Sequence, residues 1–411
     1  AASAALYGPR GANGVIIITT KQGQSDSKTT VNVKASFGGS SRAVRDYDRI
    51  GTDQYFELYW EALRNQYALD TKNYTPQTAA IKASKDLVGK LMGAGPNPYG
   101  SKYPQPVGTD GKLADGAVPL WNFDWQDAME QQALRTELGL NVSGGGKTNQ
   151  YYFSAGYLND KGIALESGYQ RFNLRLTNKL KVFDNFSIES VIAYNRQDQV
   201  APSQLNRTLT SSYPQPGLPA STIDGKPYSW GTWLSPIWFA ELGGDNKLKV
   251  SEINISEKFT YNINKHLDVV ANLGYNSGVA SRDIKKMAIT SYNYAGTKIN
   301  TKADGYKQEE SSYEKTSSRT DFYSMAGYVD YHNTFAQHHN VSAMVGAQYE
   351  LKEYDYFGVS VKDIQNSLET VNGAGLVNLT DKHGTKWHEA VMSYYSRLNY
   401  NYCLLYTSPS P

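Results

Sequence analysis

Cysteine is almost absent from the 411-residue chain, and Cys403 is the single example. One cysteine excludes an internal disulfide framework. The six histidines form neither a HExxH pattern nor a paired-cysteine zinc site, and no GxSxG nucleophile motif occurs. The sequence therefore predicts no catalytic residues, no metal site and no cofactor, and it predicts that the protein is not an enzyme.

Long apolar runs are also lacking, and no run approaches the roughly 18 residues of a membrane-spanning helix. Charged residues make up only 19% of the chain, and the mean hydropathy is −0.55. The net charge of +2 gives no sign of nucleic-acid binding. A hydropathy plot would class such a chain as soluble. Transmembrane β-barrels escape that test, because every second residue of their strands is polar.

Alternation of apolar and polar residues is what the chain has in abundance, together with 32 tyrosines and 36 glycines. In the first alternating segment, Val31, Val33 and Phe37 share one face and Asn32 and Lys34 the other. A period of two is typical of half-buried strands. Ten such segments are predicted as strands: residues 29–39, 135–143, 150–159, 169–181, 186–198, 247–261, 266–277, 319–333, 340–351 and 390–402.

Connection lengths between these strands follow a pattern. Tight turns are predicted at residues 144–147, 183–185, 262–265 and 334–338, and the other connections are longer, so all short turns lie at one end of the sheet. Bacterial outer-membrane barrels have short periplasmic turns and long extracellular loops. Tyrosines near strand ends fit interfacial girdles, although tyrosine also favours any sheet. The candidates are Tyr157, Tyr194, Tyr261, Tyr275, Tyr349, Tyr400 and Tyr402.

The first long connection, residues 40–133, is too long for a hairpin loop. Residues 52–69 have apolar side chains near helical spacing and predict a helix capped by Thr52 or Asp53. Residues 97–116 are rich in Pro, Gly and Tyr and predict an irregular loop.

The first 23 residues differ from the rest of the chain. Gly8, Gly11 and Gly14 form a glycine-rich turn, and the β-branched run from Val15 to Thr20 predicts a strand covered on both faces. A phosphate loop is a weaker alternative, since GPRGANG matches neither the P-loop nor the dinucleotide spacing and leads into a strand.

The stretch from Ala4 to Lys21 resembles the end of the plug domain in SusC/RagA-family TonB-dependent outer-membrane transporters. The resemblance continues through residues 122–128 and 141–157. It implies an all-β fold, a partial transmembrane antiparallel β-barrel of about ten of twenty-two strands that is open in isolation and follows the C-terminal end of a plug. The expected parts are the plug end 1–23, a linker 24–28, the N-terminal part of the barrel 29–402 with long extracellular loops, and a non-native tail 403–411.

The resemblance also implies a function: TonB-dependent import of an oligosaccharide or peptide nutrient across the bacterial outer membrane. The implied partners are TonB, through a segment upstream of residue 1, a SusD-like surface lipoprotein and outer-membrane lipid, with no nucleic acid. The alternative is a soluble or surface-exposed all-β carbohydrate-binding or carbohydrate-active protein, in which the same alternation builds a sandwich.

Two sets of residues are candidate functional sites. The plug signature is formed by Tyr7, Gly8, Arg10, Gly11, Ala12, Asn13 and Gly14. Arg10 is a candidate partner for a carboxylate inside the barrel, with a solvent contact at the turn as the alternative. Loop aromatics that could stack on a sugar or grip a peptide are Trp121, Trp125, Tyr228, Trp230, Trp233 and Trp238. The alternative for each of these rings is packing of the long loops on one another.

Overall fold

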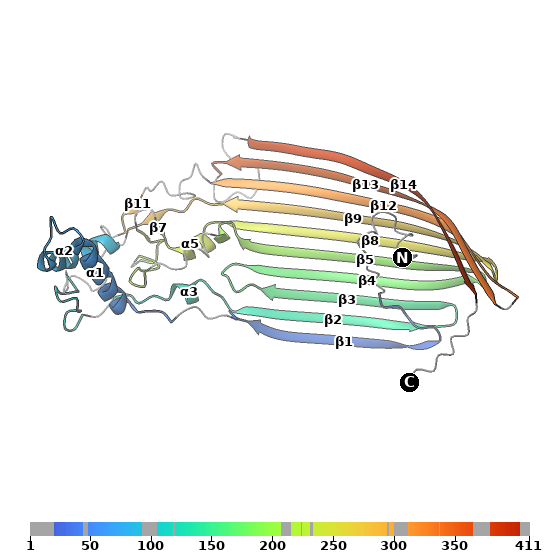
Figure 1. The fold of residues 1–411 in the computed structure, drawn as a ribbon, viewed down its shortest axis with the longest axis horizontal. Coiled ribbons are helices and arrows are strands. Elements are labelled where there is room, and N and C mark those ends of the chain that lie inside the picture. The colour runs from blue at the N-terminus through green and yellow to red at the C-terminus, as the bar shows by residue number, and fades with distance from the viewer. Residues whose placement is uncertain are drawn as a thin grey trace.

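A computed structural model describes residues 20–43, 48–92, 105–117, 120–206, 215–222, 224–230, 233–293, 296–299, 311–336, 338–364 and 379–402. The plug signature and the tail 403–411 lie outside these residues. Ten strands pair antiparallel, each with its neighbours in chain order, in one sheet (Figure 1). They are β1 (Ser27–Ser40), β2 (Ala133–Gly145), β3 (Asn149–Lys161), β4 (Gly168–Phe183), β5 (Phe186–Pro202), β8 (Asp245–Asn264), β9 (Leu267–Lys286), β12 (Ser312–Phe335), β13 (His339–Lys362) and β14 (Leu379–Tyr402).

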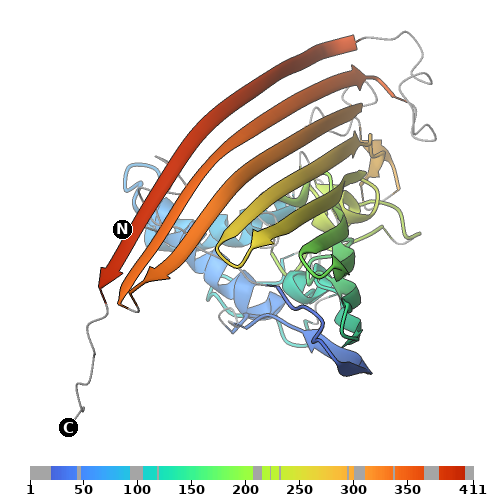
Figure 2. The same cartoon turned by 90° about the vertical axis from the view of Figure 1, so that its right-hand side faces the viewer.

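The sheet is strongly curved and does not close on itself (Figure 2). Its order runs from β1 to β14, and these two strands form its edges. The predicted open sheet with edges in the first and tenth strands is therefore confirmed. The short turns join β2 to β3, β4 to β5, β8 to β9 and β12 to β13 at one end, as the connection lengths predicted.

Register separates the side chains into two faces. One row across five strands contains Val33, Leu140, Ala155, Leu174 and Tyr194. Because side chains alternate along each strand, the next row points the other way. We call the face with Val33 the apolar face.

The neighbouring row belongs to the opposite face, which we call the polar face. It contains Lys34, Gly139, Gly156, Asn173 and Asn195. On β14 the apolar-face residues Tyr394 and Leu398 are 79% and 73% exposed, whereas the polar-face residue Arg397 is half-buried. The polar face is therefore the concave side of the curved sheet.

The apolar face has a band of aliphatic and aromatic side chains between two boundaries. Toward the long loops it ends at charged pairs, such as Arg319 Nε with Asp321 Oδ2 at 2.7 Å. Toward the short turns it ends at aromatic rings, with Phe186 and Tyr261 centroids 6.4 Å apart. Tyr349 of the predicted girdle set lies within the band, opposite Met325. Not every predicted girdle tyrosine is therefore at an edge of the band.

The last strands are longer than predicted. β12 begins at Ser312 instead of residue 319, β13 continues to Lys362 instead of 351, and β14 begins at Leu379 instead of 390. Residues 379–389, which the sequence placed in the connection before the tenth strand, belong to that strand instead. The added ends of β12 and β14 have mostly polar residues on both faces, so the apolar alternation weakens there although the backbone ladder continues, whereas the added end of β13 keeps Phe357, Val359 and Val361 on one face. Main-chain pairing needs no particular side chain, and it extends the sheet beyond the apolar band.

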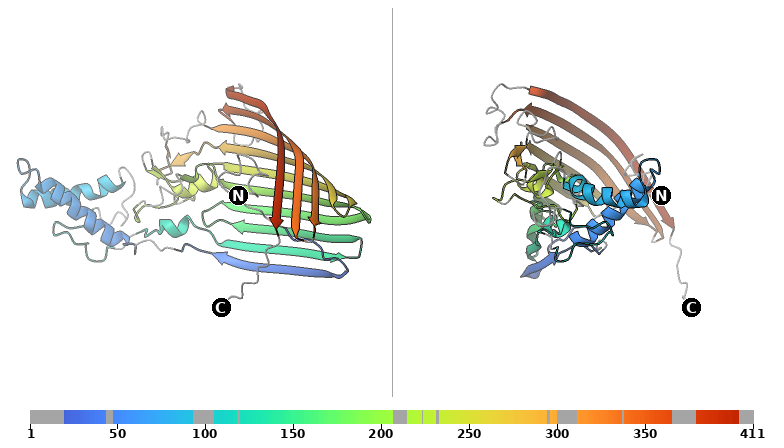
Figure 3. Two further views of the ribbon diagram at one scale, coloured as in Figure 1. Left: turned by 45° about the vertical axis from the view of Figure 1, so that its right-hand side comes forward. Right: turned by 90° about the vertical axis from the view of Figure 1, so that its left-hand side faces the viewer.

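A helical unit lies beyond the long-loop end of the sheet (Figure 3). It consists of α1 (Thr52–Ala68) and α2 (Pro76–Met92), with α3 (Trp125–Ala128) nearby. The sequence predicted α1 but not α2, whose buried face consists largely of small residues such as Ala79 and Ala83. We call the unit the loop cap; its buried core is Phe56, Trp60, Leu63, Ala80, Ala83, Leu87, Val107, Trp125, Leu218 and Tyr228.

Contacts distant in sequence fix the start of α1. Thr52 is its first residue and Gly51 its N-cap, so the predicted cap by Thr52 or Asp53 was wrong. The Thr52 backbone N–H donates to Asn122 Oδ1 at 3.2 Å, and Thr52 Oγ1 donates to the Trp121 carbonyl at 2.7 Å. A side chain seventy positions away thus satisfies a backbone donor that the local sequence leaves open.

The remaining described elements are small and lie in the long connections: β6 (Ser229–Trp230), β7 (Trp233–Leu234), α5 (Pro236–Glu241), β10 (Ser291–Tyr292) and β11 (Lys298–Ile299). Among the described residues, no helix has the length and apolar character needed to span a bilayer.

We predict that Phe56→Ala destabilises the loop cap by about 3–5 kcal/mol, because the ring is fully buried and its removal leaves a cavity. Leu58→Ala, on the same helix at a side chain that is 50% exposed, is the matched control and should cost far less. Hydrogen exchange of α1 and α2 measures the effect, with β4 and β5 as the internal reference. Equal protection in both variants would contradict the assigned core.

Candidate functional site

Most of the predicted loop aromatics belong to the packing of the long connections. Trp125 is fully buried in the loop-cap core, and its Nε1–H donates to the Gln215 carbonyl at 3.3 Å. Tyr228 is equally buried, and burial raises its pKa to about 12. Trp121 packs against the same core. The packing alternative therefore describes the side chains of Trp125 and Tyr228.

The other loop aromatics are on the segment between β5 and β8. Trp238 is half-buried and donates from Nε1 to the Ala220 carbonyl at 3.0 Å. Trp230 and Trp233 pair through their backbones in β6 and β7, and their side chains lie outside the described residues. The structure thus brings the six predicted aromatics to the same long-loop end of the sheet.

Another tyrosine in the loop cap is electrostatically coupled to its neighbours. The Tyr67 hydroxyl donates to Asp86 Oδ2 at 2.7 Å, and Lys82 Nζ lies 2.5 Å from the same carboxylate oxygen. Burial, followed by the hydrogen bond to Asp86, raises the pKa of Tyr67 to about 12. The group stays neutral at physiological pH and acts as a structural donor between α1 and α2.

A column of cations runs along the polar face of β4. Alternate residues of the strand point to this face, and they include Arg171, Arg175, Lys179 and Lys181. We call these four residues the basic column. With a rise of about 3.4 Å per residue, the column spans about 34 Å of the wall.

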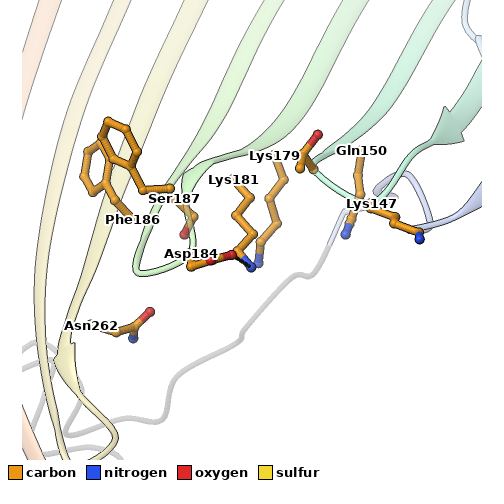
Figure 4. Close-up of a pocket in the computed structure, with 10 residues that line it drawn as sticks. Lys147, Gln150, Lys179, Lys181, Asp184, Phe186, Ser187 and Asn262 are labelled. Atoms are coloured by element: carbon orange, nitrogen blue, oxygen red, sulfur yellow. Dashed lines mark ion pairs between the residues drawn. The ribbon is translucent and has the colours of Figure 1, made fainter.

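We call Arg171 and Arg175, nearer the long loops, the upper half of the basic column, and Lys179 and Lys181, nearer the short turns, its lower half. The lower half is paired with acids. Lys179 Nζ lies 2.8 Å from Glu189 Oε1, and Lys181 Nζ lies 2.8 Å from Asp184 Oδ1. Lys179, Lys181 and Asp184, with Lys147 of the β2–β3 turn, border a hollow of about 210 Å³ at the short-turn end (Figure 4). Both lysines are about half exposed and Asp184 is fully exposed, and such solvent-accessible pairs contribute little to stability.

The upper half of the column has no carboxylate partner among the described residues. Arg175 Nη2 donates to Thr20 Oγ1 at 2.9 Å, a neutral acceptor. Its Nε atom is buried without a hydrogen-bond partner, and so is the hydroxyl of Thr177, the next polar-face residue of β4. Thr177 is only 6% exposed. Arg171 is exposed nearer the long-loop end.

The end of the predicted plug segment lies against this wall. Besides the contact of Thr20 with Arg175, Gly23 lies so close to β3 that a Cβ there would be 2.5 Å from the backbone N and O of Tyr151. Only glycine fits such a close approach between backbones.

A second group on the polar face, on β12 to β14, was not predicted from the sequence. Tyr354 and Trp387 pair across β13 and β14 with ring centroids 5.4 Å apart, and Lys352 Nζ lies 5.4 Å from the Trp387 ring centroid. Glu350 and Glu389 line a hollow of about 470 Å³ next to them. The missed signal was alternation in residues 379–389, where charged side chains on both faces hid the period.

The polar face can bind a ligand by charge and hydrogen bonding, and nothing in its described residues resembles a catalytic set. No group of three or more His, Cys, Asp or Glu side chains in the described part of the chain could hold a metal ion. Charge is distributed unevenly over the wall. Cations predominate on β1 to β4, whereas the polar faces of β12 to β14 carry both signs of charge: the acids are Glu314, Asp330, Glu350 and Glu389, and the cations are Lys352, Lys362 and Arg397.

Comparisons with known proteins show which proteins this chain is similar to. No family model matches the sequence. TonB-dependent receptor P39 of Formosa agariphila is 24% identical over 98% of this chain and 34% of its own length. TonB-dependent receptor SusC of Bacteroides thetaiotaomicron is 30% identical over 42% of this chain and 12% of its own length. The chain thus spans about a third of the curated relative that it matches throughout.

Solved structures share the fold. The RagAB peptide importer in its "closed-closed" state superposes with a TM-score of 0.70 at 18% identity, covering 97% of this chain and 43% of that chain. Its "open-open" state gives the same TM-score at 19% identity. The chain is thus similar in sequence to TonB-dependent receptors, SusC among them, and it shares the fold of the RagAB importer, which supports the resemblance to the SusC/RagA family seen in the sequence.

Proposed function

We propose that this chain forms the plug end and the first wall of a transporter that imports an oligosaccharide or peptide nutrient across the bacterial outer membrane, driven by TonB. The observation that supports the proposal most strongly is the sheet itself. It has an apolar band on its convex face, a charged and polar concave face, and all its short turns at one end. Lipid outside and a water-filled passage inside require this arrangement.

The two ends of the sheet suggest where the partners bind. A SusD-like surface lipoprotein would meet the loop cap, which lies with the long connections on the extracellular side. TonB would act on the plug from the short-turn end. The plug signature residues, Arg10 included, lie outside the described structure, and their role in holding the plug is part of the proposal.

The sandwich alternative is not favoured by the exposure of the apolar face. A β-sandwich buries this face against a second sheet. Here Leu273 is 45% exposed and Val345 65% exposed, and the other described sheets are two-stranded ribbons in the loops. The aligned apolar side chains of β9 and β13 are therefore not covered by a second layer.

We predict that Met325→Lys lowers the stability of the transporter in lipid by about 2–4 kcal/mol, because Met325 is in the middle of the apolar band. The matched control is Ala326→Lys, which places the same charge on the polar face, opposite Asn272 and Gln348. Urea titration in lipid vesicles, read from the gel mobility of the unheated protein, measures both. Equal losses, or a wild-type protein soluble without detergent, would contradict the proposed membrane wall.

We also predict that import depends on the proton gradient. Cells lacking the transporter should fail to grow on at least one member of a panel of oligosaccharides and peptides that the parent uses. Uptake of that compound should stop when TonB is deleted or the gradient is collapsed, since the plug is opened from the periplasm. Uptake that continues without TonB would instead indicate a passive channel.

The loop aromatics Trp121, Trp230, Trp233 and Trp238 remain proposed contacts for the imported compound. Combined Trp230→Ala and Trp233→Ala should weaken its binding about tenfold or more, because each lost ring of a binding hot spot costs over about 1 kcal/mol. Isothermal titration of the purified transporter measures the change. Trp125→Phe, a change within the loop-cap core, is the control for indirect effects. Unchanged affinity in the double variant would remove the contact hypothesis.

A further inference from the structure

The upper half of the basic column has more positive charge than its surroundings neutralise. Arg171 and Arg175 have no ion pair among the described residues, and the guanidinium of Arg175 donates only to the neutral Thr20 hydroxyl. A neighbouring cation on the same face, Arg135, differs from them, because its Nη1 lies 3.1 Å from Asp160 Oδ2. The unpaired charge is thus confined to one place on the wall.

Two buried donors at that place lack acceptors. Arg175 Nε and the Thr177 hydroxyl are both buried without a hydrogen-bond partner, and they belong to successive polar-face residues of β4. A buried donor without an acceptor costs about 1–3 kcal/mol, and more when it is charged. An acceptor that binds both atoms would recover that cost. A guanidinium binds carboxylates through two parallel hydrogen bonds, so an anionic oxygen group fits best.

The basic column continues on both sides of these two atoms. Arg171 is exposed, and it is four residues, about 14 Å, above Arg175 along the strand. Lys179 and Lys181 continue the column toward the short turns. There Lys147 adds a third cation to the border of the hollow at the short-turn end (Figure 4). Cations therefore follow the wall from the loops to the short-turn end, although Glu189 and Asp184 weaken the lower half.

We propose that the polar face of β4 binds an anionic ligand, an oligomer carrying carboxylate groups, with Arg171 as its first contact and Arg175 with Thr177 as its tightest subsite. This inference rests on the proposed import function, because it names the chemical class of the imported compound.

The test compares acidic probes with matched neutral ones on the whole purified transporter in detergent. The probes are tetragalacturonate against its methyl ester, and tetraglutamate against tetraglutamine, so that the two pairs distinguish a sugar from a peptide carrier of the charge. In 50 mM NaCl, at least one acidic probe should bind tenfold or more tightly than its neutral match. Raising the salt to 300 mM should narrow that difference, because salt screens exposed charges.

Three variants assign the effect to residues. Combined Arg171→Gln and Arg175→Gln should lower acidic-probe affinity about tenfold and leave neutral-probe affinity unchanged. Arg196→Gln, on the apolar face of the next strand, is the matched control and should change neither. Thr20→Ala removes the contact to Arg175 while keeping its charge, and it should also retain acidic-probe binding.

The outcomes separate this inference from the import function. Equal binding of the acidic and neutral members in both pairs, including no measurable binding of either, overturns the anionic-ligand proposal even if TonB-dependent uptake holds. A double Arg variant that weakens acidic and neutral probes alike overturns it as well. Acidic binding through Arg171 and Arg175 in a protein whose uptake is independent of TonB would leave the anion site standing and overturn the import function.

Discussion

Hydrogen bonding between the backbones of neighbouring strands is the interaction on which this structure depends. Ten strands pair antiparallel in chain order, and the ladder fixes which residues share a face. Once Val33 is opposite Leu140, every other residue of both strands is assigned to one side. The apolar band, the polar wall and the basic column all follow from this register. Side chains then decide what each face contacts.

The two faces have different tolerances for charge. On the apolar face, charged side chains lie mainly beyond the band, as in the Arg319–Asp321 pair, because a charge in lipid is costly. The polar face has charges along its whole length, since water or a ligand can solvate them. Within that face, Arg175 Nε, Thr177 Oγ1 and Asn195 Oδ1 are buried without a hydrogen-bond partner among the described residues. A ligand that supplies an acceptor to such a buried donor gains binding free energy, because the folded chain leaves that hydrogen bond unmade.

Much of the fold was predictable because strands leave a local signal. The first five strands were predicted within a few residues at most ends, since clean alternation marks a wall with unlike sides. Two later strands, β12 and β14, were predicted too short, because beyond the apolar band the residues around Lys315 and Lys386 are mostly polar on both faces. The helix α2 was missed, as its buried alanines give little contrast. The Asn122 acceptor for α1 was not predictable, since it depends on a contact across the loop cap.

The sequence by itself determined the strand class, the open sheet, the one-sided short turns and the family resemblance, because each is written in local periodicity or in a contiguous motif. Only the tertiary structure decided which side chains meet. It packed Trp125 and Tyr228 into a loop core, paired Tyr354 with Trp387, and left Arg175 beside Thr177 without a carboxylate. Strand register and loop packing decide these contacts. They bring together residues that are far apart in the sequence, and sequence separation alone does not tell which of them will meet.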